Sequence, residues 1–184
     1  MKTTLAFALG LSVLSFAAVA QAPAPLAPPT PRADSTGSIG STMTRDFMTK
    51  AASANMLEIE TSRLALDKSS DADVRQFAEV MIRDHGEAAV KFRTAAQQGR
   101  LTPPMAKLDI DQARAFEQLK AASGEEFNRK FIMLQKSAHA DAMTLFQAYA
   151  QNGDNPAITS FAQTLLPTLQ SHQQMVEKLG DTRS

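Results

Sequence analysis

The sequence predicts an all-α protein, because several long stretches repeat apolar residues every three or four positions and none shows the alternation of a half-buried strand. The clearest stretch is residues 74–96, which reads VRQFAEVMIRDHGEAAVKFRTAA and forms one apolar stripe on a helix. Short breaks rich in Ser, Gly, Asn and Pro separate these stretches. We therefore expect a four-helix bundle with one additional short helix.

The first two long helices are expected over residues 44–68 and 72–98. Thr44 is an acceptable N-cap for the first helix, and Asp71 is one for the second. Gly99 is expected at the C′ position that ends the second helix. The break between the two helices is so short that they should be antiparallel neighbours.

A crossover of about 25 residues is expected next, long enough to run along the bundle. It includes the helix-breaking pair Pro103-Pro104 and a short helix over residues 109–122, with Asp109 as its predicted N-cap. The third long helix is expected over residues 125–151 and the fourth over residues 156–179. Asn155 is the predicted N-cap of the fourth helix, and Gly180 is its predicted stop.

Residues 1–22 have the composition of a secretory signal peptide. One early cation, Lys2, precedes an apolar run that ends in small residues, and cleavage is acceptable after Ala20 or Ala22. The apolar run is too short to span a bilayer comfortably as a retained helix. We therefore expect an exported, periplasmic protein whose mature chain has no transmembrane segment.

Residues 23–43 consist mostly of Pro, Ala, Ser, Thr and Gly, which cannot bury a core. This segment is expected to be a disordered tether that could hold the domain near an envelope surface such as the outer membrane. Residues 44–180 are then the folded domain, and residues 181–184 form a short tail.

The overall composition excludes several functions. The 19 Lys and Arg residues balance the 19 Asp and Glu residues, so the chain lacks the basic character of nucleic-acid-binding proteins. There is no cysteine, which excludes disulfides, a thiol nucleophile and a thiolate metal site. Neither a hydrolase triad nor a glycine-rich phosphate loop is present. No catalytic residue and no organic cofactor is therefore predicted.

Four polar residues are expected on the inner faces of the four long helices: Glu58, His85, His139 and His172. Their heights follow from a rise of about 1.5 Å per residue. Measured from the turn after the first helix, they lie at about 18, 22, 21 and 17 Å, provided that the crossover returns the chain to that end. All four therefore fall within about one helical turn of a common level.

Two interpretations of this polar level remain open. Three imidazoles and a carboxylate are suitable ligands for a single zinc, copper, iron or nickel ion. Asp84, Gln135 or Asp141 could orient the rings. Alternatively, the four side chains form a buried hydrogen-bonded layer, in which Glu58 pairs with a protonated histidine and His139 reaches solvent.

A dinuclear carboxylate-bridged centre is not expected. Such bundles carry Glu-x-x-His pairs on two of their helices. Here the residues three positions before the histidines are Ile82, Lys136 and Leu169.

The order of short motifs along the chain resembles the domain of unknown function 4142, a family of exported bacterial proteins often labelled "predicted outer membrane protein". The matching motifs span about residues 46–179. They are Asp46-Phe47 with Ala51 and Asn55, Glu58-Ile59-Glu60, Leu64-Ala65, Val74 to Ala78, Met81 to His85, Phe127 to Phe131, Gln135 with His139, and Leu166-Pro167-Thr168-Leu169 before His172.

The resemblance implies a ferritin-like four-helix bundle but no established reaction. The expected function is thus an exported binding protein of the cell envelope or stress response without catalysis. The alternative is a metal-binding, redox-active protein that uses Glu58, His85, His139 and His172. Neither the sequence nor the resemblance indicates a partner or an oligomeric state.

Overall fold

The computed structural model describes residues 40–182, which form five α-helices and no β-strand. The predicted all-α class is therefore confirmed for this part of the chain. The predicted signal peptide, most of the predicted tether and the last two residues of the tail lie outside the described residues.

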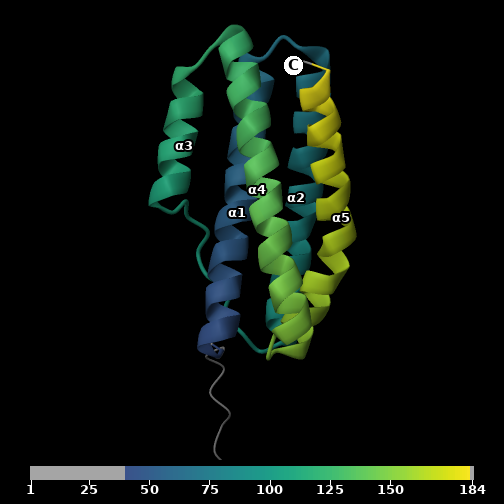
Figure 1. Cartoon of the computed structure of the whole chain (residues 1–184). Coiled ribbons are helices and arrows are strands. Elements are labelled where there is room, and N and C mark those ends of the chain that lie inside the picture. The colour runs from purple at the N-terminus through teal and green to yellow at the C-terminus, as the bar shows by residue number, and fades with distance from the viewer. Residues whose placement is uncertain (1–39, 183–184) are drawn as a thin grey trace, which may run out of the picture. The chain divides into compact units, whose positions relative to one another are not determined.

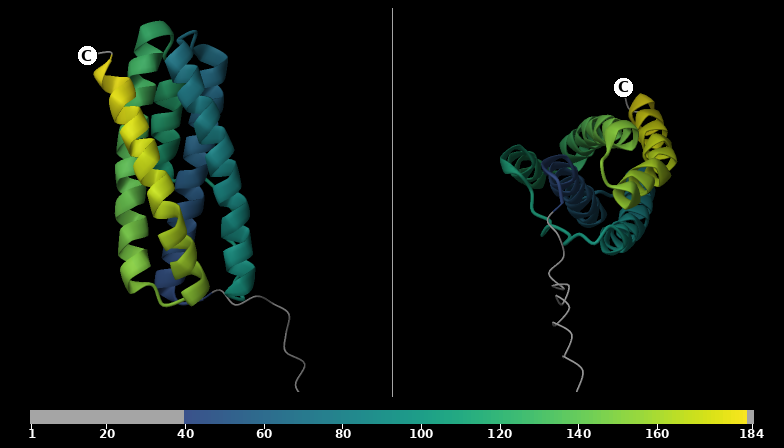
Figure 2. Two further views of the ribbon diagram at one scale, coloured as in Figure 1. Left: turned by 90° about the vertical axis from the view of Figure 1, so that its right-hand side faces the viewer. Right: turned by 90° about the horizontal axis from the view of Figure 1, so that it is seen from below.

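Four of the helices are long. They are α1 (Thr42–Lys68), α2 (Ala72–Gln98), α4 (Gly124–Asn152) and α5 (Pro156–Asp181), whereas α3 (Ile110–Ala121) is short. Helices α1 and α5 each contact both α2 and α4, so the four long helices lie side by side around a common interior (Figure 1). Helix α3 packs on the outside, against α1 and α4, as the end-on view in Figure 2 shows. None of these helices combines the length and the apolar character needed to cross a membrane.

Three predicted N-caps are observed. The Asp71 side chain accepts hydrogen bonds from two backbone N–H groups in the first turn of α2. Asp109 and Gln112 form a reciprocal capping box at the start of α3. Asn155 caps α5, whose first residue is Pro156. These local bonds satisfy N–H groups that lack partners within the helix, which is why the starts of these helices could be predicted.

The first helix begins two residues before its predicted start. Ser41 is the N-cap, and its hydroxyl accepts a hydrogen bond from the Thr44 backbone N–H at 3.1 Å. The Thr44 side chain instead lies 2.7 Å from the hydroxyl of Tyr149 on α4. The residue predicted to cap α1 therefore joins two helices.

The end of α2 also differs from the prediction. Gly99 has a φ of −76°, whereas Arg100 has a φ of 55° and occupies the left-handed C′ position. The backbone N–H groups of Arg100 and Leu101 complete the two bonds of a Schellman motif. A Cβ on Gly99 would lie 2.8 Å from Asn155 Oδ1, so this glycine permits the close approach of the α5 N-cap.

Gly180 does not stop the last helix, which continues to Asp181. A Cβ on Gly180 would collide with the flexible end of the Lys136 side chain on α4, so a larger residue would displace that side chain.

The interior of the described domain contains two clusters of buried apolar residues. One includes Phe47, Phe92, Phe146, Phe161 and Leu169, and the other includes Val74, Phe77, Met81, Phe131 and Val176. On each long helix the residues of the two clusters are separated by a stretch that contains Glu58, His85, His139 or His172. The polar level thus lies between two apolar regions.

Candidate metal centre

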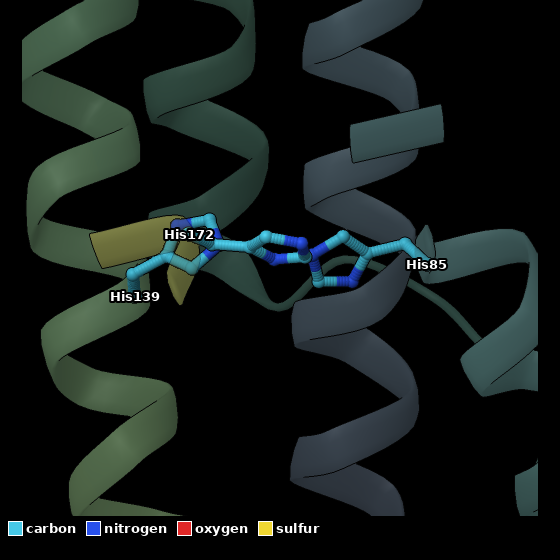
Figure 3. Close-up of side chains that lie close together, drawn as sticks. All are labelled: His85, His139 and His172. Carbon is cyan, nitrogen blue, oxygen red and sulfur yellow. The ribbon is translucent and has the colours of Figure 1, made fainter. Parts of the chain in front are cut away.

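Three histidine rings from three helices converge at this level. His85 comes from α2, His139 from α4 and His172 from α5, and the three rings face one another (Figure 3). One ring nitrogen from each histidine lies within 4.8 Å of the corresponding nitrogens of the other two. The ring centroids are 5.3 to 5.7 Å apart.

All three rings are withdrawn from solvent. His139 has an exposed fraction of 0%, His172 of 2% and His85 of 7%. The expectation that His139 reaches solvent is therefore wrong. The neighbouring helices cover this ring completely.

Each ring uses one nitrogen in a hydrogen bond to an oxygen acceptor. His85 Nδ1 lies 3.1 Å from Asn55 Oδ1 on α1. His139 Nδ1 lies 3.0 Å from the backbone oxygen of Gln135, one turn earlier on α4. His172 Nε2 lies 2.9 Å from Asp84 Oδ2 on α2. Because these oxygens only accept hydrogen bonds, they place the ring proton on the nitrogen nearest to them.

The other nitrogen of each ring has no hydrogen-bond partner among the described residues. His85 Nε2, His139 Nε2 and His172 Nδ1 are all buried and unsatisfied. With the ring protons on the opposite nitrogens, these three atoms carry lone pairs. A buried acceptor without a donor is costly, and three of them on adjoining rings form an arrangement that a metal cation would satisfy.

The histidines are held in their neutral form. Burial is the main cause that lowers the pKa of His85 to about 3, and the neighbouring His139 and His172 rings lower it further. Burial also lowers the pKa of His139 to about 4, against the opposing effect of the Gln135 backbone. It lowers the pKa of His172 as well, although Asp84 acts in the opposite direction. Neutral imidazole is the form that binds metals.

Glu58 lies beside this group rather than within it. Its Oε1 is 3.6 Å from His139 Nδ1, the nitrogen already bonded to the Gln135 backbone. Only 2% of Glu58 is exposed, and this burial raises its pKa to about 8, with a contact from the Gln135 side chain acting in the opposite direction. A protonated Glu58 is therefore expected near neutral pH. The structure brings together three of the four predicted ligands and places the fourth next to one of them.

The groups that orient the rings were predicted only in part. Asp84 and Gln135 do contact histidines, although Gln135 uses its backbone oxygen. Asp141 is exposed and is not among the partners of the rings. The role of Asn55 was not predicted. Its signals in the sequence are its place among the residues that match the family and the fact that Asn, a weak helix former, stands one turn before Glu58 in a long helix.

Comparison with known proteins identifies the family of the chain. The sequence model of a family described as a domain of unknown function, DUF4142, matches residues 28–179. No curated protein and no solved structure matches the chain. The family match covers most of the chain and agrees with the resemblance seen in the short motifs. This protein therefore belongs to the DUF4142 family.

Proposed function

We propose that this domain binds a single transition-metal ion through His85, His139 and His172. The observation that carries the proposal is the set of three unpartnered nitrogens on buried, neutral rings. In a structural polar layer, the buried acceptors would be expected to have donors. Here each ring is oriented by one hydrogen bond and keeps the opposite nitrogen available, as histidine ligands in metalloproteins do.

The donor set favours zinc, copper, iron or nickel, because neutral imidazole nitrogens suit these ions. In a tetrahedral site with bonds of about 2.1 Å, ligand nitrogens are about 3.4 Å apart. One nitrogen of each ring lies within 4.8 Å of the other two, so the proposal requires the three side chains to move closer together when the ion binds. Three protein ligands would leave a coordination position for water or another small molecule.

We further infer that the domain is a ferritin-like four-helix bundle exported to the periplasm and associated with the cell envelope. The arrangement of α1, α2, α4 and α5 and the resemblance of the motifs support the ferritin-like architecture. The composition of residues 1–22 supports export. Mass spectrometry of protein from the periplasmic fraction should find a mature chain that starts at Gln21 or Pro23. A cytoplasmic protein that retains residues 1–22 would contradict export.

The proposal assigns metal binding and no reaction. We prefer metal binding to the buried polar layer that the sequence also allowed. That layer needs a protonated histidine and a charged Glu58. Burial opposes both ionised forms.

The decisive experiment is elemental analysis of protein purified without an affinity tag. Wild type should contain about one equivalent of one transition metal, and His85→Ala should contain almost none. Asn128→Ala is the matched control, because Asn128 is equally buried but bonds to Ser69 in another part of the interior. It should retain the metal. The proposal would be overturned if the wild type held well under one equivalent of metal both as purified and after incubation with each candidate ion.

A further inference from the structure

A cavity of about 260 Å³ adjoins the histidine cluster. It extends between α1, α2, α4 and α5, and the segment that links α2 to α3 forms part of its wall. The cavity is partly open to solvent, so a ligand could enter it. Small-molecule sites are concave spaces of this kind, lined mostly by apolar side chains.

The walls of the cavity are mainly apolar and partly aromatic. Alanine side chains from α1, α2 and α4 create the space, because each presents only a methyl group where a larger residue would fill it. The rings of Phe92, Phe146 and Phe161 line the remaining wall together with Leu165 and Leu169. Such a lining favours an apolar ligand, and especially a flat ring that can pack against other rings.

The polar lining residues are few and belong mostly to the histidine level. They are Asn55, Glu58, His85 and His139, together with the exposed Arg93. Both histidines are more than nine-tenths buried, and both have an unpartnered Nε2 atom. These nitrogens are acceptors, so a ligand with one hydroxyl donor could satisfy one of them.

The charge of the lining selects the type of polar group. Among the described residues that line the cavity, only Arg93 carries a fixed positive charge, and it is exposed to solvent, whereas Glu58 is buried beside His139. A carboxylate ligand would lose its hydration without gaining a buried cation. A neutral hydroxyl avoids this cost.

We infer that this cavity is a binding site for a small phenol, with the ring between the phenylalanines and the hydroxyl directed at the histidines. The volume fits this class, because an apolar cavity of about 150 Å³ in another protein binds benzene. The inference uses two of the proposed metal ligands but does not require an ion. It can therefore be tested on metal-free protein, separately from the proposed function.

The test is calorimetric titration of protein treated with EDTA. The probes are three methylbenzenes that differ only in the group opposite the methyl, namely 4-methylphenol, p-xylene and 4-methylbenzoate. We expect 4-methylphenol to bind about tenfold more tightly than p-xylene, because its hydroxyl pairs with a buried acceptor. We expect 4-methylbenzoate to bind most weakly. Absence of 4-methylphenol binding, equal affinities for 4-methylphenol and p-xylene, or a preference for 4-methylbenzoate would each overturn the inference.

Two variants locate the site. Ala142→Leu on α4 and Ala89→Leu on α2 place additional side-chain atoms in the cavity and should each weaken 4-methylphenol binding at least tenfold. Ala89 is only half-buried, so its variant should fold even if Ala142→Leu does not. Ala148→Leu is the matched control, because Ala148 is exposed on α4 and does not line the cavity. If all three variants bind 4-methylphenol as the wild type does, the ligand site lies elsewhere and the inference is wrong.

Discussion

Asp84 Oδ2 on α2 lies 2.9 Å from His172 Nε2 on α5, so a carboxylate on one helix sets the tautomer of a ring on another. Burial alone would raise the pKa of Asp84, but its hydrogen bonds to Arg83 and His172 hold the pKa below its ordinary value. Asp84 is therefore ionised at neutral pH. It keeps the proton on His172 Nε2 and leaves Nδ1 available as a ligand.

Replacing Asp84 should weaken metal binding without removing any proposed ligand. We expect Asp84→Ala to lower affinity about 10- to 100-fold, the usual effect of losing a group that orients a metal-binding histidine. Asp84→Asn should lower it less, because its amide oxygen can still accept from Nε2. The affinity is measured by competition with a chelator of known strength. Asp141→Ala on the exposed surface of α4 is the control, and equal affinities for Asp84→Ala and this control would contradict the role of Asp84.

Acid should destabilise the metal-free protein through the histidines. The pKa of His85 is about 3 in the folded state, below the ordinary value of 6.5, so the unfolded chain takes up the proton first. Stability associated with neutral His85 is complete above pH 6.5 and is lost as the pH falls towards 3. The free energy of unfolding should fall by up to about 1.4 kcal/mol per pH unit for each such histidine. Urea titrations between about pH 4 and 7 measure this slope.

His85→Leu is the matching variant for the acid experiment, because it removes one of the groups that resist protonation. Its unfolding free energy should fall less steeply with acid than that of the wild type. Identical slopes would mean that His85 is not held neutral by burial.

The starts of α2, α3 and α5 were predictable because N-caps and apolar stripes are local properties of the chain. Asp71, Asp109 and Asn155 bond to backbone groups within three residues, so their roles can be recognised without tertiary structure. The common level of His85 and His139 was predictable for a similar reason, since helix rise fixes height along a bundle. Height along the helices is therefore the part of the candidate site that the sequence determines.

Features that depend on contacts between helices were not predictable in this way. Asn55 orients His85 only because α1 and α2 pack at a particular rotation, which the stripe does not determine. Glu58 was placed among the ligands by its height, but its rotation directs it to the outer nitrogen of His139. Gly99 resembled a helix terminator, yet its role depends on the distant residue Asn155. The cavity depends on which alanines face one another, which the sequence does not reveal either.

The raised pKa of Glu58 should make the metal-free protein lose stability as the pH rises from about 4.5 to about 8. Its folded pKa is about 8 against an ordinary value of 4.5, so the folded state holds this proton more tightly than the unfolded state. The associated stability is complete below pH 4.5 and is lost as the pH rises to about 8. Glu58→Gln cannot ionise and should become progressively more stable than the wild type over this range, by up to several kcal/mol.

The comparison of Glu58→Gln with wild type is made by urea unfolding at about pH 5, 7 and 9. Glu60→Gln is the control, because Glu60 is more exposed than Glu58 and pairs with Arg63 at the surface. A difference between Glu58→Gln and wild type that stays constant with pH would show that Glu58 is ionised in the folded protein throughout.

Metal binding should raise the melting temperature, because an ion held by three helices stabilises the folded state alone. A free ion concentration of about 100 times Kd adds about 2.7 kcal/mol, which corresponds to a rise of roughly 10 °C for a domain of this size. Calorimetry of EDTA-treated protein with added zinc, copper(II) or nickel measures the shift. His139→Phe should abolish it, because His139 is a proposed ligand and α4 would present an apolar ring in its place. A rise of the same size in His139→Phe would place the ion elsewhere and exclude His139 as a ligand.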